Sequence, residues 1–338
     1  MTKIFIALVV LGAVTPNTWA AIDGNVVNGT TGKPQAGVSV TLLKPGQQGM
    51  RSLGVTISDS AGHFGFQNDE PGGGPQLLQA AYNGVNYNKL LTPNVPTSGV
   101  DLEIYEATKS PAVAEITQQM LLIEPNSSQI AISQSVVVRN DSKTTYNNTE
   151  LGGLVFFLPP AANGQVRVNA QGPQGMPLPR TPEKTSERDV FKIDFPIKPG
   201  QTEFDINYVL PAGSPFTFRG RVVNVKGMRA GPLRLIVPSG VSLSGKDVQS
   251  LGTEPKTQLA IYNVIARDSF LTDITGTGSI RDNSDNSSGD ESDSPQVREG
   301  EPQVYAHLPW LVGLTFAILG VGLLMLFRNS PVRAPYTK

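Results

Sequence analysis

The residues from Ile22 to Leu43, IDGNVVNGTTGKPQAGVSVTLL, contain two strand-length runs and the turn that joins them. Ile22–Asn28 and Val38–Leu43 are rich in β-branched residues, whereas Gly29–Pro34 holds the glycines and the proline that interrupt regular structure. The same pattern recurs along the chain, which has 35 glycines and 27 prolines among 338 residues. Helix-period apolar patterns are nearly absent between the two ends of the chain. We therefore predict an all-β fold.

The first domain is predicted to span residues 21–107. Further strand-length runs follow the first two, at Leu53–Ser58, His63–Gln67, Gln76–Tyr82 and Val100–Tyr105. Between two of them, Asp59–Gly62 (DSAG) has the composition of a tight hairpin turn, because Asp bonds to its own turn and Gly accepts positive φ. Six or seven short strands in about 85 residues indicate a small β-sandwich.

Two motifs in this domain carry a family resemblance. The pattern G-x-V-x-N-x-T-T-G-x-P-x-A-G-V-x-V-x-L runs from Gly24 to Leu42, and the hairpin SDSAGHFGF follows from Ser58 to Phe66. Together they resemble the carboxypeptidase regulatory-like domain, a transthyretin-like (prealbumin-like) β-sandwich with Greek-key connections. The resemblance covers about a quarter of the chain. It implies carbohydrate or protein binding without a fixed catalytic residue, and it transfers no ligand-binding residue to this sequence.

Three side chains of this domain are candidates for a ligand surface. Tyr82 and Tyr87 flank and enter the segment Asn83–Asn88 (NGVNYN), and their amphipathic rings are suited to stacking on a sugar. The alternative is that both rings pack on their own sheet. His63, beside Phe64 in the hairpin, is either a hydrogen-bond donor to a ligand or a solvent-facing strand residue.

A second, larger sandwich of eight or nine strands is predicted over residues 110–269. Its clearest strand is Gln129–Asn140, in which Ile130, Ile132, Val136 and Val138 alternate with more polar residues. The other predicted strands are Met120–Ile123, Leu151–Leu158, Val166–Asn169, Asp189–Phe195, Thr202–Val209, Phe216–Val223, Leu233–Val237 and Thr257–Ala266. The layout resembles ectodomains of uncharacterised bacterial envelope proteins, for which no activity is implied.

The two ends of the chain predict its location. Met1–Ala20 has a basic start, an apolar run and small residues near Ala20, which is typical of a cleavable secretory signal. Leu308–Phe327 is twenty residues without a charge, enough to cross the ~30 Å hydrocarbon core of a bilayer as a helix. Residues 328–338 carry only basic charges, so this tail is predicted to be cytoplasmic and the ectodomain periplasmic or extracellular.

The protein is thus predicted to be a single-pass protein of a bacterial inner or plasma membrane. Residues 270–306 are acidic and rich in serine, which predicts a disordered linker between the ectodomain and the membrane. Within the span, Gly313 and Ala317 form a small-xxx-small pair that is suited to pairing with another helix.

Composition and motifs limit the kinds of partner and of catalytic or metal site that we expect. The net charge of -1 offers no basic patch for a phosphate backbone, so nucleic acid is not an expected partner. There is no cysteine, and the two histidines, His63 and His307, lie far apart in the sequence. HExxH, CxxC and Gly-x-Ser-x-Gly motifs are absent, and the acidic run after Asp282 fails the spacing of an EF-hand loop. We predict no catalytic, cofactor-binding or metal-binding residue.

Three hypotheses of function remain. The first is a non-enzymatic envelope protein whose sandwiches bind carbohydrate or a partner protein. The second is an accessory or scaffold subunit of a membrane-protein complex, in which the tail helix pairs with other helices. The third is a hydrolase whose residues meet only in the folded structure.

Overall fold

A computed structural model describes residues 22–46, 49–67, 74–92, 96–173, 175–212 and 216–280. The predicted signal (1–20), most of the predicted linker and the predicted membrane span (308–327) lie outside these ranges. The described chain is all-β, with 3₁₀ turns at Pro111–Val113 (η1) and Pro160–Ala162 (η2). Over the described ranges no helix combines the length and the hydrophobicity needed to cross a membrane. The described residues fall within one compact unit that holds two separate hydrophobic cores.

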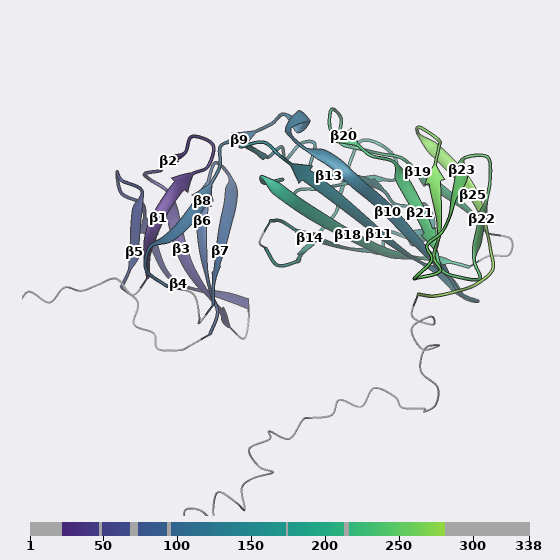
Figure 1. The fold of residues 1–338 in the computed structure, drawn as a ribbon, viewed down its shortest axis with the longest axis horizontal. Helices are drawn as coiled ribbons and strands as arrows, with labels where there is room; N and C mark the ends of the chain where they lie inside the picture. Colours follow the sequence, from purple (N-terminus) through teal and green to yellow (C-terminus); the bar gives the residue numbers. More distant parts are fainter. Residues whose placement is uncertain are drawn as a thin grey trace, which may run out of the picture. The chain divides into compact units, whose positions relative to one another are not determined.

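The first core lies between two four-stranded sheets, a sandwich-like arrangement that we call the N-terminal sandwich (Figure 1). In one sheet, β1 pairs antiparallel with β2 and β5 and parallel with β8. Its strands are β1 (Ile22–Asn28), β2 (Lys33–Pro34), β5 (His63–Phe66) and β8 (Val100–Ile104). The other sheet has the order β4-β3-β6-β7, with β3 (Ser39–Gly46), β4 (Gly49–Ile57), β6 (Gln76–Tyr82) and β7 (Val85–Leu91).

Alternation explains which side chains enter this core. Successive side chains of a strand point to opposite faces, so β1 buries Ile22, Gly24, Val26 and Asn28 in turn. Gly24 is required in this series because a Cβ there would lie 1.9 Å from the carbonyl oxygen of Val100 on β8. The glycine thus permits the close parallel pairing of β1 with β8.

Two strands of the N-terminal sandwich are not among the predicted ones. The short β2 lies within the predicted turn Gly29–Pro34, and Val85–Leu91, which includes most of the polar segment Asn83–Asn88, is the edge strand β7. Asn83 and Gly84 have φ values of 49° and 75°, the left-handed conformation of a two-residue hairpin turn between β6 and β7. The prediction failed because the Asn-rich composition of β7 hid its alternation of buried Val85, Tyr87 and Leu91.

The second core is formed by a nine-stranded sheet together with two three-stranded sheets (Figure 1). The long sheet has the order β15-β14-β18-β11-β10-β21-β24-β23, and β20 also pairs with β10. Its strands are β10 (Glu115–Pro125), β11 (Gln129–Asn140), β14 (Val166–Gln171), β15 (Leu178–Arg180), β18 (Gly200–Pro211), β20 (Arg229–Ala230), β21 (Leu233–Val237), β23 (Val248–Thr253) and β24 (Ala260–Val264).

The smaller sheets cover the buried face of the long one. One contains β13 (Leu154–Phe157), β16 (Glu183–Lys184) and β17 (Val190–Ile193), and the other contains β19 (Phe216–Arg221), β22 (Ser242–Ser244) and β25 (Ser269–Thr275). Phe270 and Ile274 of β25 are buried in this core. The predicted start of the linker at residue 270 was therefore wrong, because the second core continues through β25.

Candidate functional site

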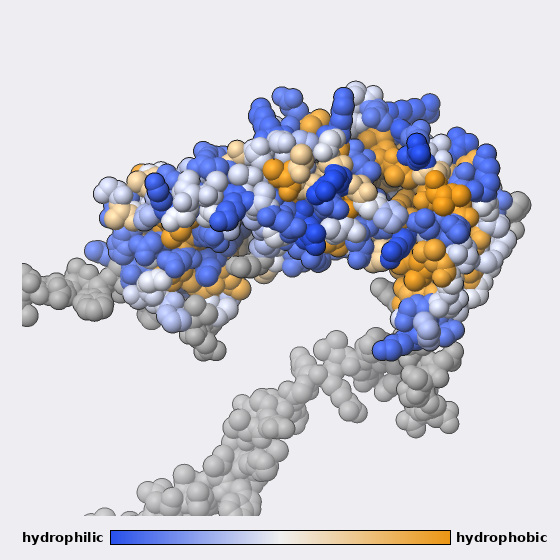
Figure 2. Space-filling model, turned by 45° about the horizontal axis from the view of Figure 1, so that its top comes forward, coloured by the Kyte–Doolittle hydropathy of each residue, from blue (hydrophilic) through white to orange (hydrophobic). Residues whose placement is uncertain are grey.

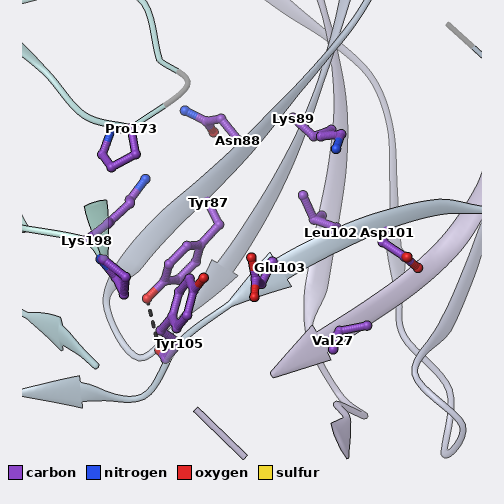
Figure 3. Close-up of a pocket in the computed structure, with 11 residues that line it drawn as sticks. Val27, Tyr87, Asn88, Lys89, Asp101, Leu102, Glu103, Tyr105, Pro173 and Lys198 are labelled. Carbon is purple, nitrogen blue, oxygen red and sulfur yellow. Dashed lines mark hydrogen bonds between the residues drawn. The ribbon is translucent and has the colours of Figure 1, made fainter. Parts of the chain in front are cut away.

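The two sheets of the N-terminal sandwich separate along one side and leave a cavity of about 360 Å³. It lies where β7, the edge strand of one sheet, meets β8, the edge strand of the other. Residues of the second core, Pro173, Lys198 and Pro199, line its remaining wall. Figure 3 labels Pro173 and Lys198 together with the lining residues of β7 and β8. We call this cavity the β7–β8 cleft.

Alternation places charged groups at the cleft. On β8, Asp101 and Glu103 alternate with buried Val100, Leu102 and Ile104, so both carboxylates point away from the core. On β7, Lys89 is on the same side as buried Val85 and Tyr87, but it lies near the open end and is only half-buried. The cleft therefore has cationic and anionic side chains on neighbouring edge strands.

Tyr87 forms the floor of the cleft and is only 3% exposed. Its hydroxyl donates to the carbonyl oxygen of Tyr105 at 2.9 Å, so the hydroxyl of Thr145, also at 2.9 Å, is left to donate to Tyr87. Burial raises the pKa of Tyr87, and burial together with Glu103 raises the pKa of Tyr105. Both phenols stay neutral at physiological pH and act as hydrogen-bonding groups.

Lys198 reaches the cleft from the second core. Ile197 forms a β-bridge with Tyr146, with N–H to oxygen distances of 3.0 and 2.9 Å in the two directions, which fixes the backbone next to Lys198. The Lys198 ammonium lies 5.0 Å from the centroid of the Tyr87 ring and donates to the carbonyl oxygen of Asn86. Burial, reinforced by Arg180, lowers the pKa of Lys198 to about 8.

The lowered pKa of Lys198 predicts a pH dependence of stability. The unfolded chain holds this proton up to the ordinary pKa of 10.5, whereas the folded chain releases it near pH 8. Between these values the unfolded chain binds more protons, so the free energy of unfolding rises with pH. We expect the urea midpoint of the wild type to rise relative to Lys198→Met between pH 8 and 10. Parallel pH profiles of the two proteins would contradict the shift.

The connection between the two cores is held by hydrogen bonds around Glu106. Its carboxylate accepts from Asn28 Nδ2 at 2.8 Å, from the Tyr82 hydroxyl at 2.7 Å and from Asn83 Nδ2 at 2.9 Å. Its backbone N–H donates to Thr30 Oγ1 at 2.9 Å. We call this set the Glu106 junction.

The chain beyond Glu106 is held just as firmly. Strand β9 (Ala107–Thr108) pairs parallel with β12 (Thr145–Tyr146). Thr145 N–H donates to the Glu106 carbonyl at 2.8 Å, and Asn147 N–H donates to the Thr108 carbonyl at 2.9 Å. The connecting segment is therefore a paired strand and not a free linker.

The three candidate ligand residues do not come together. Tyr87 lines the cleft, but its ring is buried, so packing on its own sheet is the arrangement observed. Tyr82 lies outside the cleft lining and belongs to the Glu106 junction. His63 is exposed on β5, in the opposite sheet, with its ring nitrogen 3.2 Å from Asn25 Oδ1. That these residues bind a ligand stays a prediction.

Sequence reasoning missed the charged residues of the cleft. The alternation V-D-L-E-I in β8 was visible and marks Asp101 and Glu103 as the outward pair. No local pattern marks Lys198, because its position depends on contacts between distant parts of the chain. Across the described ranges, no three His, Asp or Glu side chains gather as a metal site would require.

A second hollow, of about 400 Å³, lies on the outer face of the nine-stranded sheet. Met120, Leu122 and Ile236 provide its apolar part, and Asp205 is one of its polar residues. Burial, and next the charge of Glu203, raises the pKa of Asp205. On the face in view in Figure 2, hydrophobic residues of the second part of the chain gather in patches between hydrophilic ones.

Comparisons with known proteins identify no family. No protein-family model matches this sequence, and no curated protein does. Solved structures that resemble it include an M1 zinc metallopeptidase from Deinococcus radiodurans, a mutant of that enzyme, and the mutant bound to a Tyr-Ser-Ala substrate. In each case the identity is 12% and the TM-score 0.26, over 48% of this chain and 42% of the other. The chain thus spans less than half of those structures, and the likeness carries no argument.

Proposed function

We propose that this chain is a non-enzymatic, membrane-anchored binding protein whose N-terminal sandwich, a transthyretin-like module, receives an extended segment of a partner protein in the β7–β8 cleft. One observation carries the proposal, namely that the cleft lies between two edge strands. Each has a single strand partner among the described residues, β6 for β7 and β1 for β8. Free strand edges present main-chain N–H and C=O groups to an incoming extended peptide.

The charges around the cleft support a polypeptide ligand. Asp101 and Glu103 favour basic groups, whereas Lys89 and Lys198 favour acidic groups or main-chain carbonyls. A mixed-charge segment in extended conformation satisfies both sets. Carbohydrate, the other ligand class that the family resemblance suggests, has less support because the Tyr87 ring is covered.

The two ends of the chain give the protein its proposed location. Met1–Ala20 directs the protein out of the cytoplasm, and Leu308–Phe327 holds it in the membrane with residues 328–338 inside. The acidic residues after Ile280 separate the folded part from the bilayer. The cleft then faces the periplasm or the cell exterior, where a partner segment is free to enter.

The test is photo-crosslinking of the full-length chain in its native membrane. A photoreactive residue at Lys89, which lines the cleft, is compared with one at Glu203, which is exposed on β18. We expect the probe at position 89 to become attached to one defined segment of one protein. The double change Asp101→Asn and Glu103→Gln should reduce that product about tenfold or more, because charged hydrogen bonds contribute ~1.5–3 kcal/mol each.

Two outcomes would contradict the proposal. Equal products at Lys89 and Glu203 would mean that the cleft is not the binding site. Attachment of glycan alone at Lys89, with the same dependence on Asp101 and Glu103, would make the protein a carbohydrate-binding module. Exchange of Leu308–Phe327 for an unrelated apolar segment separates a simple anchor, which keeps the product, from a complex subunit that depends on helix pairing.

A further inference from the structure

The outer face of the β4-β3-β6-β7 sheet has no ionisable side chain at its outward positions between the strand ends. These positions are every second residue from Ser39 to Leu43 in β3, from Leu77 to Ala81 in β6 and from Asn86 to Leu90 in β7, with Val55 and Ile57 in β4. The register confirms that they share one face, because Thr41 pairs with both Val55 and Gln79, and Gln79 pairs with Asn88. We call this surface the neutral face.

The opposite sheet of the same sandwich is different. Its outward positions include the ionisable side chains of Asp23, His63, Asp101 and Glu103, as is usual for an exposed sheet face. Absence of charge is therefore specific to one face of the N-terminal sandwich. Loss of charged residues is the compositional mark of the buried centre of protein interfaces.

The neutral face also exposes large apolar side chains. Val55 is 63% exposed, Ile57 is 66% exposed and Leu90 is 44% exposed. They surround smaller residues such as Ser39, Thr41 and Ala81. Covering these side chains gains hydrophobic free energy in proportion to the apolar area removed from water.

The polar groups at the centre of the face are partly satisfied within the face. Gln79 Nε2 donates to Asn88 Oδ1 at 3.1 Å, so these two amides already pair with each other. Removing this pair from water costs less free energy than removing two unpaired amides, because the desolvation cost is largest for a buried polar group without a hydrogen-bond partner. The polar groups at the centre of the neutral face therefore oppose its burial only weakly.

We infer that the neutral face packs against the same face of a second copy of this chain. Charge complementarity selects this partner. The charged side chains of a typical protein surface would meet no counter-charge on the neutral face, whereas a second neutral face brings no charge into the contact. A two-fold axis through the face makes it self-complementary, and sheet faces pack at ~10 Å with strands near −30°. A sugar surface would meet no aromatic ring among the outward positions.

The size of the face sets the strength of this association. Four strands ~4.8 Å apart and five to seven residues of ~3.3 Å each cover about 400 Å² per copy. A standard interface buries ~800 Å² per partner. The dimer is therefore weak and concentration-dependent, of the kind that forms between copies held in one membrane.

Single cysteines provide the direct test, because the native chain has none. Full-length variants Thr41→Cys, Val55→Cys, Gln79→Cys and Asn88→Cys are treated in the membrane with a bis-maleimide linker, and His63→Cys on the opposite sheet is the matched control. Sheet faces that pack ~10 Å apart are too distant for a direct disulfide, which needs Cα atoms ~4.4–6.8 Å apart, so the linker must bridge the two thiols. Positions near the two-fold axis should crosslink most. We expect at least one face position to yield several times more covalent dimer than His63→Cys. Yields no higher than the control at all four positions would overturn the inference.

A charge on the face provides the second test. Thr41→Glu and Val55→Glu place like charges opposite each other in the dimer, whereas His63→Glu places a charge on the other sheet. Sedimentation of the full-length chain in detergent should show association about tenfold weaker for the first two variants, with circular dichroism unchanged because Val55 and Thr41 are not core residues. Association that is equal in all three variants would assign the contact to another surface, such as the tail helix.

Discussion

Phe204→Ala is expected to lower the free energy of unfolding of the second core by about 3 to 5 kcal/mol. Phe204 is fully buried (0% exposed) in the middle of β18, the strand that joins β11 to β14 in the long sheet. Its ring and that of Phe195 form a T-shaped contact, with centroids 5.8 Å apart. Truncation removes the apolar contacts and leaves a cavity that the rigid sheet cannot close.

Val209→Ala is the matched control, because Val209 lies on the same strand but is 45% exposed. It should change stability by less than about 0.5 kcal/mol. Both tryptophans, Trp19 and Trp310, lie outside the described residues, so far-ultraviolet circular dichroism in guanidinium chloride is the suitable measurement. Equal midpoints for the two variants would contradict the placement of Phe204 in the core.

Glu106→Ala is expected to cost about 3 kcal/mol, mainly at the Glu106 junction. The change leaves Asn28 Nδ2, the Tyr82 hydroxyl and Asn83 Nδ2 without their carboxylate acceptor. Hydrogen bonds to a charged group contribute ~1.5–3 kcal/mol each, and bonds that share one acceptor add less than their sum. Asn28 is 1% exposed, so water cannot readily replace the lost acceptor.

Tryptic cleavage after Lys109 measures this loss locally. Lys109 follows β9, and Asn148 Nδ2 contacts its carbonyl oxygen at 3.4 Å. We expect cleavage to accelerate strongly in Glu106→Ala and moderately in Glu106→Gln, which keeps one acceptor oxygen. Glu103→Ala, which removes a carboxylate outside the Glu106 junction, should leave the rate unchanged. An unchanged rate in Glu106→Ala would mean that the junction is held by the pairing of β9 with β12 alone.

The fold class and many of the strands could be predicted from the sequence. Ile22–Asn28, Gln76–Tyr82, Gln129–Asn140 and Leu233–Val237 are strands with the predicted bounds. The reason is that these strands bury one face and expose the other, so their burial pattern is written in alternate residues.

Strands whose alternation is absent or concealed, and one strand beyond the predicted domain end, were missed or misplaced. In β7 the asparagines that face outward concealed the pattern, although the Asn83-Gly84 dipeptide is a recognised hairpin signal. Strand β23 is exposed at nearly every position and therefore has no periodic signal. Strand β25 does alternate, but it lies beyond the domain end predicted at residue 269. The all-β class is confirmed, while these element bounds needed the structure.

The candidate site was less predictable than the fold. Tyr87 was identified because it is aromatic and lies in a polar segment. Its hydroxyl is bonded to Tyr105, which follows β8, and to Thr145 of β12, and neither contact is visible in the local sequence. Lys198 has no sequence signal, since its lowered pKa arises only from the surroundings that the fold assembles. No pattern in the sequence marks Glu106, although its carboxylate is the acceptor for three side chains.

The sequence by itself determined that this chain is built from strands, because glycine and proline punctuation and two-residue alternation act over a few residues. It also determined the absence of cysteine and the scarcity of histidine, which narrow the available chemistry. Only the tertiary structure decided that β7 and β8 meet at a charged cleft and that one sheet has a neutral outer face. Both features depend on which strands become neighbours, and pairing between distant segments is set by packing of the whole core and not by local pattern.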